Sequence, residues 1–202
     1  MIVIGLTGSI GMGKTTTAGL FADAGVPVND SDAVVHTLYK GEAASLIEQA
    51  FPGTTKDGVV DRVKLGECLK VNPAKFAELE AIVHPLVRQK EKEFLAKQRA
   101  EGQHLVVLDI PLLFETGAEN RVDIVVVVSC DEAIQKARVL SRPGMTEEKF
   151  AMITARQMPD RVKRSKADFV IDTGLGIDVA RARVGDILSA IRAGQKRDNP
   201  DA

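Results

Sequence analysis

The stretch IVIGLTGSIGMGKTT, from Ile2 to Thr16, decides the fold of this chain. Its first six residues are almost entirely apolar, as expected of a strand that is buried on both faces of a parallel sheet. GSIGMGKT (residues 8–15) follows and matches the pattern G-x-x-x-x-G-K-[ST]. A helix is predicted to begin near Lys14, so the pattern lies between a strand and a helix, where it has physical meaning. The sequence therefore predicts a phosphate-binding loop.

Each residue type in this loop has a physical task. Gly8, Gly11 and Gly13 let the backbone bend so that consecutive N–H groups point inward. Those donors, together with the positive end of the following helix, hold phosphate oxygens. Lys14 is expected to reach the β- and γ-phosphates, and the Thr15 hydroxyl is expected to bind Mg²⁺. A dinucleotide-binding G-x-G-x-x-G loop is excluded, because the third glycine of that pattern is missing.

Apolar strands and helical patterns alternate along the rest of the chain, which is typical of a parallel sheet with helices on both faces. The segment between the second and third strands is too long for a simple crossover and is interpreted as an inserted helical lobe. Within it, GTTKDG (53–58) is predicted to turn, and Asn72-Pro73 to be the N-cap and first residue of a helix. The predicted strands cover residues 2–7, 26–28, 105–110, 123–129 and 168–172, and the predicted helices of the core cover about 14–24, 131–140, 146–158 and 176–193.

Composition restricts the function classes. The 202 residues are 45% hydrophobic and 27% charged with a formal net charge of −1, which argues against a general binder of polyanions. The absence of Trp and the single Tyr disfavour base stacking on nucleic acid. Cys68 and Cys130 have no metal-ligand spacing and are expected to be reduced thiols at packing positions. No apolar run reaches the roughly 20 residues that span a bilayer, and the N-terminus does not resemble a signal peptide. We expect a cytoplasmic protein that binds neither nucleic acid nor membrane.

The guanine-reading motifs of GTPases are absent or misplaced. A signalling GTPase should carry D-x-x-G, and this tetrad does not occur in the chain. SKAD (165–168) imitates the N/T-K-x-D motif, but it precedes its strand instead of following it, and it is interpreted as a basic loop that enters the strand. The GTPase class is therefore disfavoured.

A small-molecule kinase must close over the phosphates, because otherwise ATP is merely hydrolysed. Between Lys136 and Lys166 there are nine basic residues and only three acidic ones. The same segment contains Pro143-Gly144, a plausible hinge. This concentration of charge predicts a phosphate-clamping lid. Arg142, at the break, is the best candidate for a catalytic arginine, and Arg138, one helical turn earlier, is the second.

Two carboxylates follow the second strand directly. In VPVNDSDAVVH (26–36), Asp30 and Asp32 lie just past the strand end, where ligands of parallel α/β sheets bind. If this strand neighbours the first one, the pair faces the γ-phosphate. One carboxylate can then accept the proton of the acceptor hydroxyl, and the other can orient that hydroxyl or the waters of Mg²⁺. The alternative is that Asp32 only caps the helix that follows, and the two roles are compatible.

These segments together resemble the dephospho-CoA kinase family over about residues 2–192. The departures are small: Thr15 stands where family members often have Ser, which keeps the hydroxyl, and Asn29 stands where an apolar residue is usual. The resemblance is carried, in chain order, by IGLTGSIGMGKTT (4–16), VNDSDAVVH (28–36), IVHPLVR (82–88), LDIPLLFETG (108–117), SRPGMTEEKF (141–150) and ADFVIDTGLG (167–176).

The resemblance implies a phosphotransferase that moves the γ-phosphate of ATP to the ribose 3'-hydroxyl of dephospho-CoA. The products would be coenzyme A and ADP, in the last step of coenzyme A biosynthesis, with Mg²⁺ as cofactor. The implied fold is a P-loop parallel sheet of five strands with flanking helices. A nucleotide-binding core would comprise 1–32, 103–137 and 167–193, an acceptor lobe 33–102, and a lid 138–166.

The resemblance also implies a set of site residues. Asp32 would be the general base with support from Asp30, which is also a candidate to hold Mg²⁺ through water. The ATP loop would comprise Gly8, Ile10, Gly11, Met12, Gly13, Lys14, Thr15 and Thr16. The acceptor pocket would comprise Asp32, His84, Pro85, Arg88, Pro111, Leu112, Leu113, Phe114 and Glu115, with Arg88 toward the phosphates of the acceptor. His84 as a core histidine, and Asp109 as either a metal-site acid or a structural residue, stay open.

Two other function classes stay open. A nucleoside or nucleoside monophosphate kinase would have the same kind of nucleotide-binding core and the same kind of lid. A nucleotide-binding regulatory module with a degraded site is the non-enzymatic alternative, and the joint presence of Lys14, Thr15, Asp30 and Asp32 counts against it. We expect the protein to be a monomer or a weak homo-oligomer.

Overall fold

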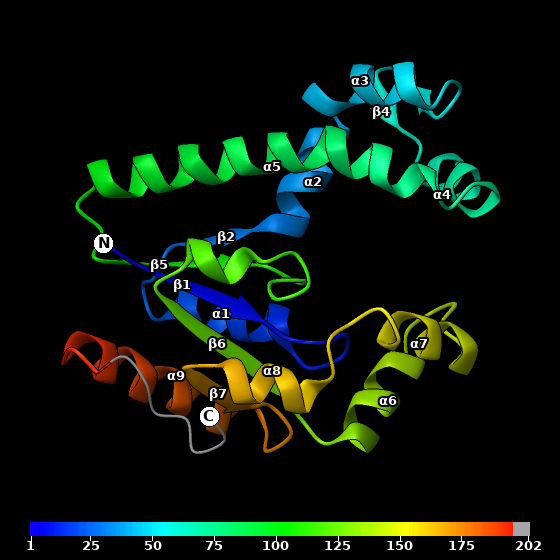
Figure 1. The fold of residues 1–202 in the computed structure, drawn as a ribbon. Helices are drawn as coiled ribbons and strands as arrows, with labels where there is room; N and C mark the ends of the chain where they lie inside the picture. Colours follow the sequence, from blue (N-terminus) through cyan, green and yellow to red (C-terminus); the bar gives the residue numbers. More distant parts are fainter. Residues whose placement is uncertain (196–202) are drawn as a thin grey trace. The chain divides into compact units, whose positions relative to one another are not determined.

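The computed structural model describes residues 1–195 and divides into two compact units (Figure 1). The core unit comprises Met1–Asn29 and the chain from Gly102 onward, and the helical unit comprises Asp30–Glu101. Each unit has its own cluster of buried apolar side chains. Within residues 1–195, no helix combines the length and the apolar character that crossing a bilayer requires.

A five-stranded sheet forms the centre of the core unit, as predicted. Its strand order is β2-β5-β1-β6-β7, and the β1–β5, β1–β6 and β6–β7 pairs are parallel. Every residue of β5 and β6 is buried, which explains why both strands are continuous apolar runs. The strands are β1 (Ile2–Thr7), β2 (Val28–Asp30), β5 (Leu105–Asp109), β6 (Ile124–Ser129) and β7 (Phe169–Asp172).

The condition stated for the acid pair, that β2 neighbours β1, is not met. β5 lies between them: Val107 is in register with Ile4 of β1, while its N–H donates to the Pro27 carbonyl at 2.9 Å. The carboxylate that ends the strand beside β1 is therefore Asp109, not Asp30. Strand order depends on crossovers between distant segments, which the local pattern does not encode.

Helices surround the sheet and supply the rest of the core. Phe21 of α1 and Ile187 of α9 are fully buried together with Ile4 and Val126 of the sheet. The helices of this unit are α1 (Lys14–Asp23), α6 (Glu132–Leu140), α7 (Glu147–Thr154), α8 (Asp160–Lys166) and α9 (Ile177–Arg192), with a short 3₁₀ helix at Ala118–Arg121.

The single helix predicted over 146–158 ends early. α7 ends at Thr154, and α8 begins at Asp160 directly after Pro159. A residue that precedes proline is disfavoured in the helical conformation, which explains the break. The interpretation of SKAD as a loop is also wrong, because Ser165 and Lys166 form the last turn of α8.

The helical unit is built on the long helix α5. The buried side chains Leu38, Ile47, Phe51, Leu65 and Leu79 form its core. The turn predicted over 53–58 contains the tip of a small hairpin, with Asp57 and Gly58 both at positive φ. The elements are α2 (Ser31–Tyr39), α3 (Glu42–Ala50), β3 (Thr55–Lys56), β4 (Val59–Val60), α4 (Arg62–Val71) and α5 (Lys75–Ala100).

The helix start predicted at Asn72-Pro73 is wrong. Asn72 is the C-cap of α4, and α5 begins only at Lys75. The carbonyls of Asn72 and Pro73 accept from the N–H groups of Lys75 and Phe76, which makes this segment a tight connection between two helices. An Asn-Pro pair also suits such a turn, so the sequence signal was ambiguous.

Candidate nucleotide-binding and phosphotransfer site

The glycines of the loop between β1 and α1 are required by space and by backbone conformation. A Cβ on Gly8 would lie 2.3 Å from Cγ2 of Val128 and 2.8 Å from its carbonyl oxygen. Gly11 and Gly13 have φ of 78° and 86°, in the left-handed region that side chains disfavour. The phosphate-binding conformation predicted from the motif therefore depends on all three glycines.

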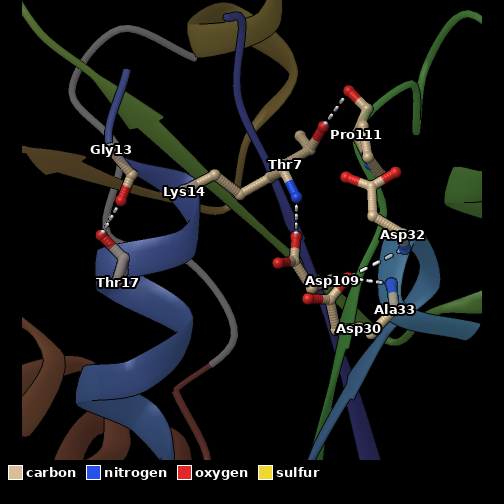
Figure 2. A network of polar contacts seen from close by, with 9 residues as sticks. All are labelled: Thr7, Gly13, Lys14, Thr17, Asp30, Asp32, Ala33, Asp109 and Pro111. Atoms are coloured by element: carbon tan, nitrogen blue, oxygen red, sulfur yellow. Dashed lines mark hydrogen bonds and ion pairs between the residues drawn. The ribbon is translucent and has the colours of Figure 1, made fainter. Parts of the chain in front are cut away.

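Lys14 begins α1, and its ammonium is held by Asp109. Lys14 Nζ lies 2.5 Å from Asp109 Oδ1, and the Asp109 side chain is only 1% exposed (Figure 2). The pair forms because β1 and β5 are neighbours, so that the residues after their carboxyl ends meet at one edge of the sheet. At the same edge the Thr7 hydroxyl donates to the Pro111 carbonyl at 3.2 Å. Asp109 thus fixes the cation that the motif supplies for phosphate.

The loop is anchored at Met12. The Met12 sulfur accepts from the Cys130 N–H at 3.2 Å, and the Met12 carbonyl accepts from the Thr173 hydroxyl at 2.8 Å. Arg138 in turn donates to the Thr173 hydroxyl at 3.0 Å and to its carbonyl at 2.8 Å. Met12 is buried, so its side chain anchors the loop instead of facing a ligand.

A cavity of about 350 Å³ opens beside the loop, within the range of small-molecule sites. Gly11, Gly13 and Thr16 line one part of it, and Arg138 and Arg142 line another. The two arginines chosen from the sequence therefore share one cavity with the phosphate-binding loop. Arg138 is fixed by its bonds to Thr173, whereas Arg142 is exposed.

The two carboxylates of the VNDSD segment have different environments within the helical unit. Asp30 is the N-cap of α2, and its Oδ1 accepts from the N–H groups of Asp32 at 2.8 Å and Ala33 at 3.1 Å (Figure 2). The alternative that Asp32 is the cap is therefore wrong. Asp32 lies in the first helical turn, its side chain is exposed, and its carboxylate has no hydrogen-bond partner among residues 30–101. Of the two carboxylates, Asp30 is thus engaged in the helix cap through Oδ1, and Asp32 is not.

The PLLFE segment after β5 is mostly structural. Leu113 is fully buried, with its Cδ1 only 2.6 Å from where a Cβ on Gly5 would lie, and Phe114 is 8% exposed. Both side chains are buried in the core, and their part in the acceptor pocket stays a prediction. Pro111 and Leu112 remain accessible.

Glu115 is engaged within the core unit. Its Oε1 lies 2.9 Å from Nζ of Lys163, which is fully buried, and accepts from the Met158 N–H at 2.8 Å. Burial alone would raise the pKa of the Glu115 carboxyl, but the hydrogen bonds from Lys163 and Met158 outweigh it, and the pKa lies below its ordinary value. Glu115 is thus ionised and ties α8 to the segment after β5. Lys163, one of the nine basic residues of the predicted lid, is committed to this pair.

Three further predicted residues lie on α5 in the helical unit. His84, Pro85 and Arg88 are all exposed, so the alternative of a buried core histidine is wrong. His84 and Arg88 are four residues apart and therefore share one face of the helix. A face that presents an imidazole and a guanidinium suits an anionic ligand.

The donor set suits Mg²⁺ held mainly by phosphates. No group of three or more His, Cys, Asp or Glu side chains that could hold a metal ion gathers within the described residues. The exposed Thr15 hydroxyl in the first turn of α1 offers one oxygen ligand. Mg²⁺ in nucleotide sites commonly takes one or two protein oxygens together with phosphate oxygens and water.

Sequence reasoning missed Thr173, Gln135 and Gln157, and it placed Lys163 only among the basic residues of the lid. Their contacts join segments more than a hundred residues apart, or bury a charge, and neither leaves a local pattern. Only the run ADFVIDTGLG pointed to Thr173.

Comparisons with known proteins agree with this geometry. The model of the dephospho-CoA kinase (CoaE) family matches residues 2–178. The chain is 66% identical over 193 residues to the dephospho-CoA kinase of Agrobacterium fabrum, covering 96% of this chain and 100% of that protein. It is 58% identical to the dephospho-CoA kinase of Rhizobium meliloti, covering 96% and 100%.

Solved structures give the same result. The crystal structure of TT1252 from Thermus thermophilus superposes with a TM-score of 0.82 at 34% identity, covering 96% of this chain and 97% of that one. The dephospho-CoA kinase from Campylobacter jejuni superposes with a TM-score of 0.72 at 26% identity, covering 95% and 98%. A shikimate kinase from Acinetobacter baumannii, at a TM-score of 0.54 and 19% identity over 96% of this chain and 94% of that one, shares the fold only.

Proposed function

The chain belongs to the dephospho-CoA kinase family, and from this premise we propose how its residues divide the work of the reaction. The enzyme transfers the γ-phosphate of ATP to the ribose 3'-hydroxyl of dephospho-CoA, giving coenzyme A and ADP in the last step of coenzyme A biosynthesis. The observation that carries the proposal is the 350 Å³ cavity, where the phosphate-binding loop and two arginines line one space.

The nucleotide is bound by the loop and the cavity. Backbone N–H groups of the loop and the N-terminus of α1 hold the β-phosphate, and Lys14 leaves Asp109 in part to meet the γ-phosphate. Arg138 and Arg142 neutralise the charge that spreads over the transferred group, which is worth several orders of magnitude in rate in related phosphoryl transfers. Loop residues Gly8, Gly11, Gly13, Thr15 and Thr16 complete this site.

Asp32 acts as the general base. Its carboxylate is exposed and unpaired within its unit, whereas Asp30 is engaged as the cap that fixes the start of α2. Asp32 accepts the proton of the ribose hydroxyl as the oxygen attacks phosphorus in line with the leaving ADP. Asp30 therefore positions Asp32 through the helix turn that both share, and it is also a candidate to hold a water of Mg²⁺.

Mg²⁺ is proposed as the cofactor. The Thr15 hydroxyl holds it, with Asp109 as a second candidate ligand or partner of its waters. When bound, the ion neutralises charge between the β- and γ-phosphates.

Dephospho-CoA is proposed to bind the helical lobe 33–102. Arg88 and His84 on α5 are suited to the acceptor's phosphates, with Pro85 beside them, and the accessible Pro111 and Leu112 supply apolar contacts. The basic segment 138–166 acts as the lid. We propose a cytoplasmic monomer or weak homo-oligomer.

The experiment is a coupled assay of ADP release with dephospho-CoA, adenosine, AMP and pantothenate in parallel. Turnover with dephospho-CoA alone is expected. A higher kcat/KM with adenosine or AMP would favour a nucleoside or nucleoside monophosphate kinase, and no ADP release with any acceptor would favour a degraded nucleotide-binding module.

A further inference from the structure

Two glutamines hold one residue of the phosphate-binding loop, Ile10, by its N–H and by its carbonyl. The Ile10 N–H donates to Gln157 Oε1 at 3.0 Å, and the Ile10 carbonyl accepts from Gln135 Nε2 at 2.8 Å. Gln135 lies on α6 and is only 6% exposed, and Gln157 lies between α7 and α8. Neither glutamine belongs to a sequence motif on which the proposed function rests.

The polarity of this arrangement is specific. A carboxamide offers one acceptor and one donor group, and here each glutamine presents the end that the backbone group of Ile10 opposite it requires. Because its N–H is directed to Gln157, Ile10 does not offer that donor to a phosphate in this structure. That Ile10 belongs to the ATP site stays a prediction, and in this structure its N–H and its carbonyl are engaged by the two glutamines.

By fixing Ile10, the two glutamines should affect how tightly the loop binds phosphate. A loop that must present several N–H groups to one phosphate pays less ordering entropy if it is already fixed. Met12 is anchored by Cys130 and Thr173, and Ile10 by the two glutamines, so both non-glycine residues that flank Gly11 are held from outside the loop. Gln157 belongs to the segment 138–166 proposed as the lid, so it connects that segment to the loop.

We propose that Gln135 and Gln157 are positioning residues, an amide clamp that holds the phosphate-binding loop in its binding conformation and couples it to the base of the lid. The inference rests on the proposal that the nucleotide binds at this loop. The clamp acts on nucleotide affinity through Ile10 and touches neither substrate.

The test uses two variants of equal added charge. Gln157→Glu keeps an acceptor opposite the Ile10 N–H, whereas Gln135→Glu replaces a donor with an acceptor that faces the Ile10 carbonyl. Both place one negative charge beside the backbone of the same residue, Ile10, so the difference between them reports hydrogen-bond polarity. We expect the Kd for ADP, measured by titration calorimetry, to rise roughly tenfold more in Gln135→Glu than in Gln157→Glu, the scale for an unsatisfied buried polar group. Equal effects of the two variants would overturn the clamp.

A second pair of variants, Gln157→Met and Gln157→Glu, tests the clamp if Gln135→Glu does not fold. Gln157→Met removes the acceptor with little change in volume, and we expect weaker ADP binding, a higher KM for ATP at similar kcat, and faster hydrogen exchange at the Ile10 amide. Gln157→Glu is expected to restore the slow exchange. Unchanged exchange in Gln157→Met would contradict the inference.

Lys14→Ala separates the two proposals. If Lys14→Ala does not weaken ADP binding, the proposed nucleotide site is wrong. If Lys14→Ala weakens it and the glutamine variants do not, only the clamp is wrong.

Discussion

Lys14 and Asp109 form an ion pair at 2.5 Å in which the carboxylate is almost completely buried. The pair places the cation of the phosphate-binding motif beside the last residue of β5, in the strand that neighbours β1. A buried carboxylate that loses the cation paired with it is strongly destabilising, so Lys14 serves both stability and binding.

Substitution of Lys14 should therefore have two separable effects. We expect Lys14→Met to lower the free energy of unfolding by about 3 kcal/mol, because the buried Asp109 loses its ion pair with Lys14. Lys14→Met/Asp109→Asn should recover most of that stability without recovering ADP affinity. Urea unfolding and calorimetry measure the two effects, and a double variant as unstable as Lys14→Met would show that the pair does not carry the stability loss.

Removal of the proposed base should affect chemistry and not nucleotide binding. Asp32→Asn is expected to lower kcat by about 10²-fold or more while the Kd for ATP stays within about threefold of the wild-type value, the usual scale for a lost general base. Single-turnover kinetics with saturating ATP give this comparison. Near-normal turnover would remove Asp32 from the mechanism.

Asp30 provides the matched control at the same helix start. Asp30→Asn retains a side-chain acceptor for the N–H groups of Asp32 and Ala33, so α2 should keep its stability, whereas Asp30→Ala should lose about 1 kcal/mol. We expect kcat to depend on whether the helix cap is kept, so that kcat is higher in Asp30→Asn than in Asp30→Ala. The reverse order would mean that the charge of Asp30, and not its cap, matters for catalysis.

The Glu115–Lys163 pair should make stability depend on acid pH in a defined direction. The pKa of Glu115 is lowered in the folded protein, so the stability that its ionised form provides is present above the ordinary pKa near 4.5. It is lost as the pH falls through the lowered folded value. Wild type should thus be more stable than Glu115→Gln at pH 7, and the difference should shrink below about pH 4. If the stability difference between the wild type and Glu115→Gln increased on acidification, the proposed stabilising role of the Glu115–Lys163 pair would be contradicted.

The two thiols should differ in reactivity. Burial raises the pKa of the Cys130 thiol, although the charge of Arg138 opposes this, and only the thiolate is reactive. Cys68 is half-buried in the helical unit. Iodoacetamide at neutral pH, followed by mass spectrometry, should label Cys68 first. Faster labelling of Cys130 would indicate that the loop around Met12 opens readily.

Local features of this fold could be predicted from sequence, and tertiary ones could not. The phosphate-binding loop and the five strands follow from a motif and from apolar runs, both of which act over a few residues. The neighbour of β1 could not be predicted, because it depends on how distant segments cross over the sheet. The burial of Leu113 and Phe114 was missed for a similar reason: an apolar segment after a strand suits a ligand or a core equally well.

The same distinction holds within the site. Lys14, Arg138 and Arg142 were found because charge in a motif or a basic segment stands out, and the two arginines line one cavity with the phosphate-binding loop. Gln135 and Gln157 are neutral residues whose function arises only when α6 and the segment after α7 meet the loop. Asn72 was misassigned because an Asn-Pro pair serves a helix start and a turn equally.

The most direct measurement is a crystal structure of the protein with ADP, Mg²⁺ and dephospho-CoA bound together. We expect the diphosphate of ADP to lie on the loop between β1 and α1, and the ribose 3'-oxygen to lie within about 2.6–3.2 Å of the Asp32 carboxylate. Diphosphate bound elsewhere, or a 3'-oxygen far from Asp32, would contradict this expectation.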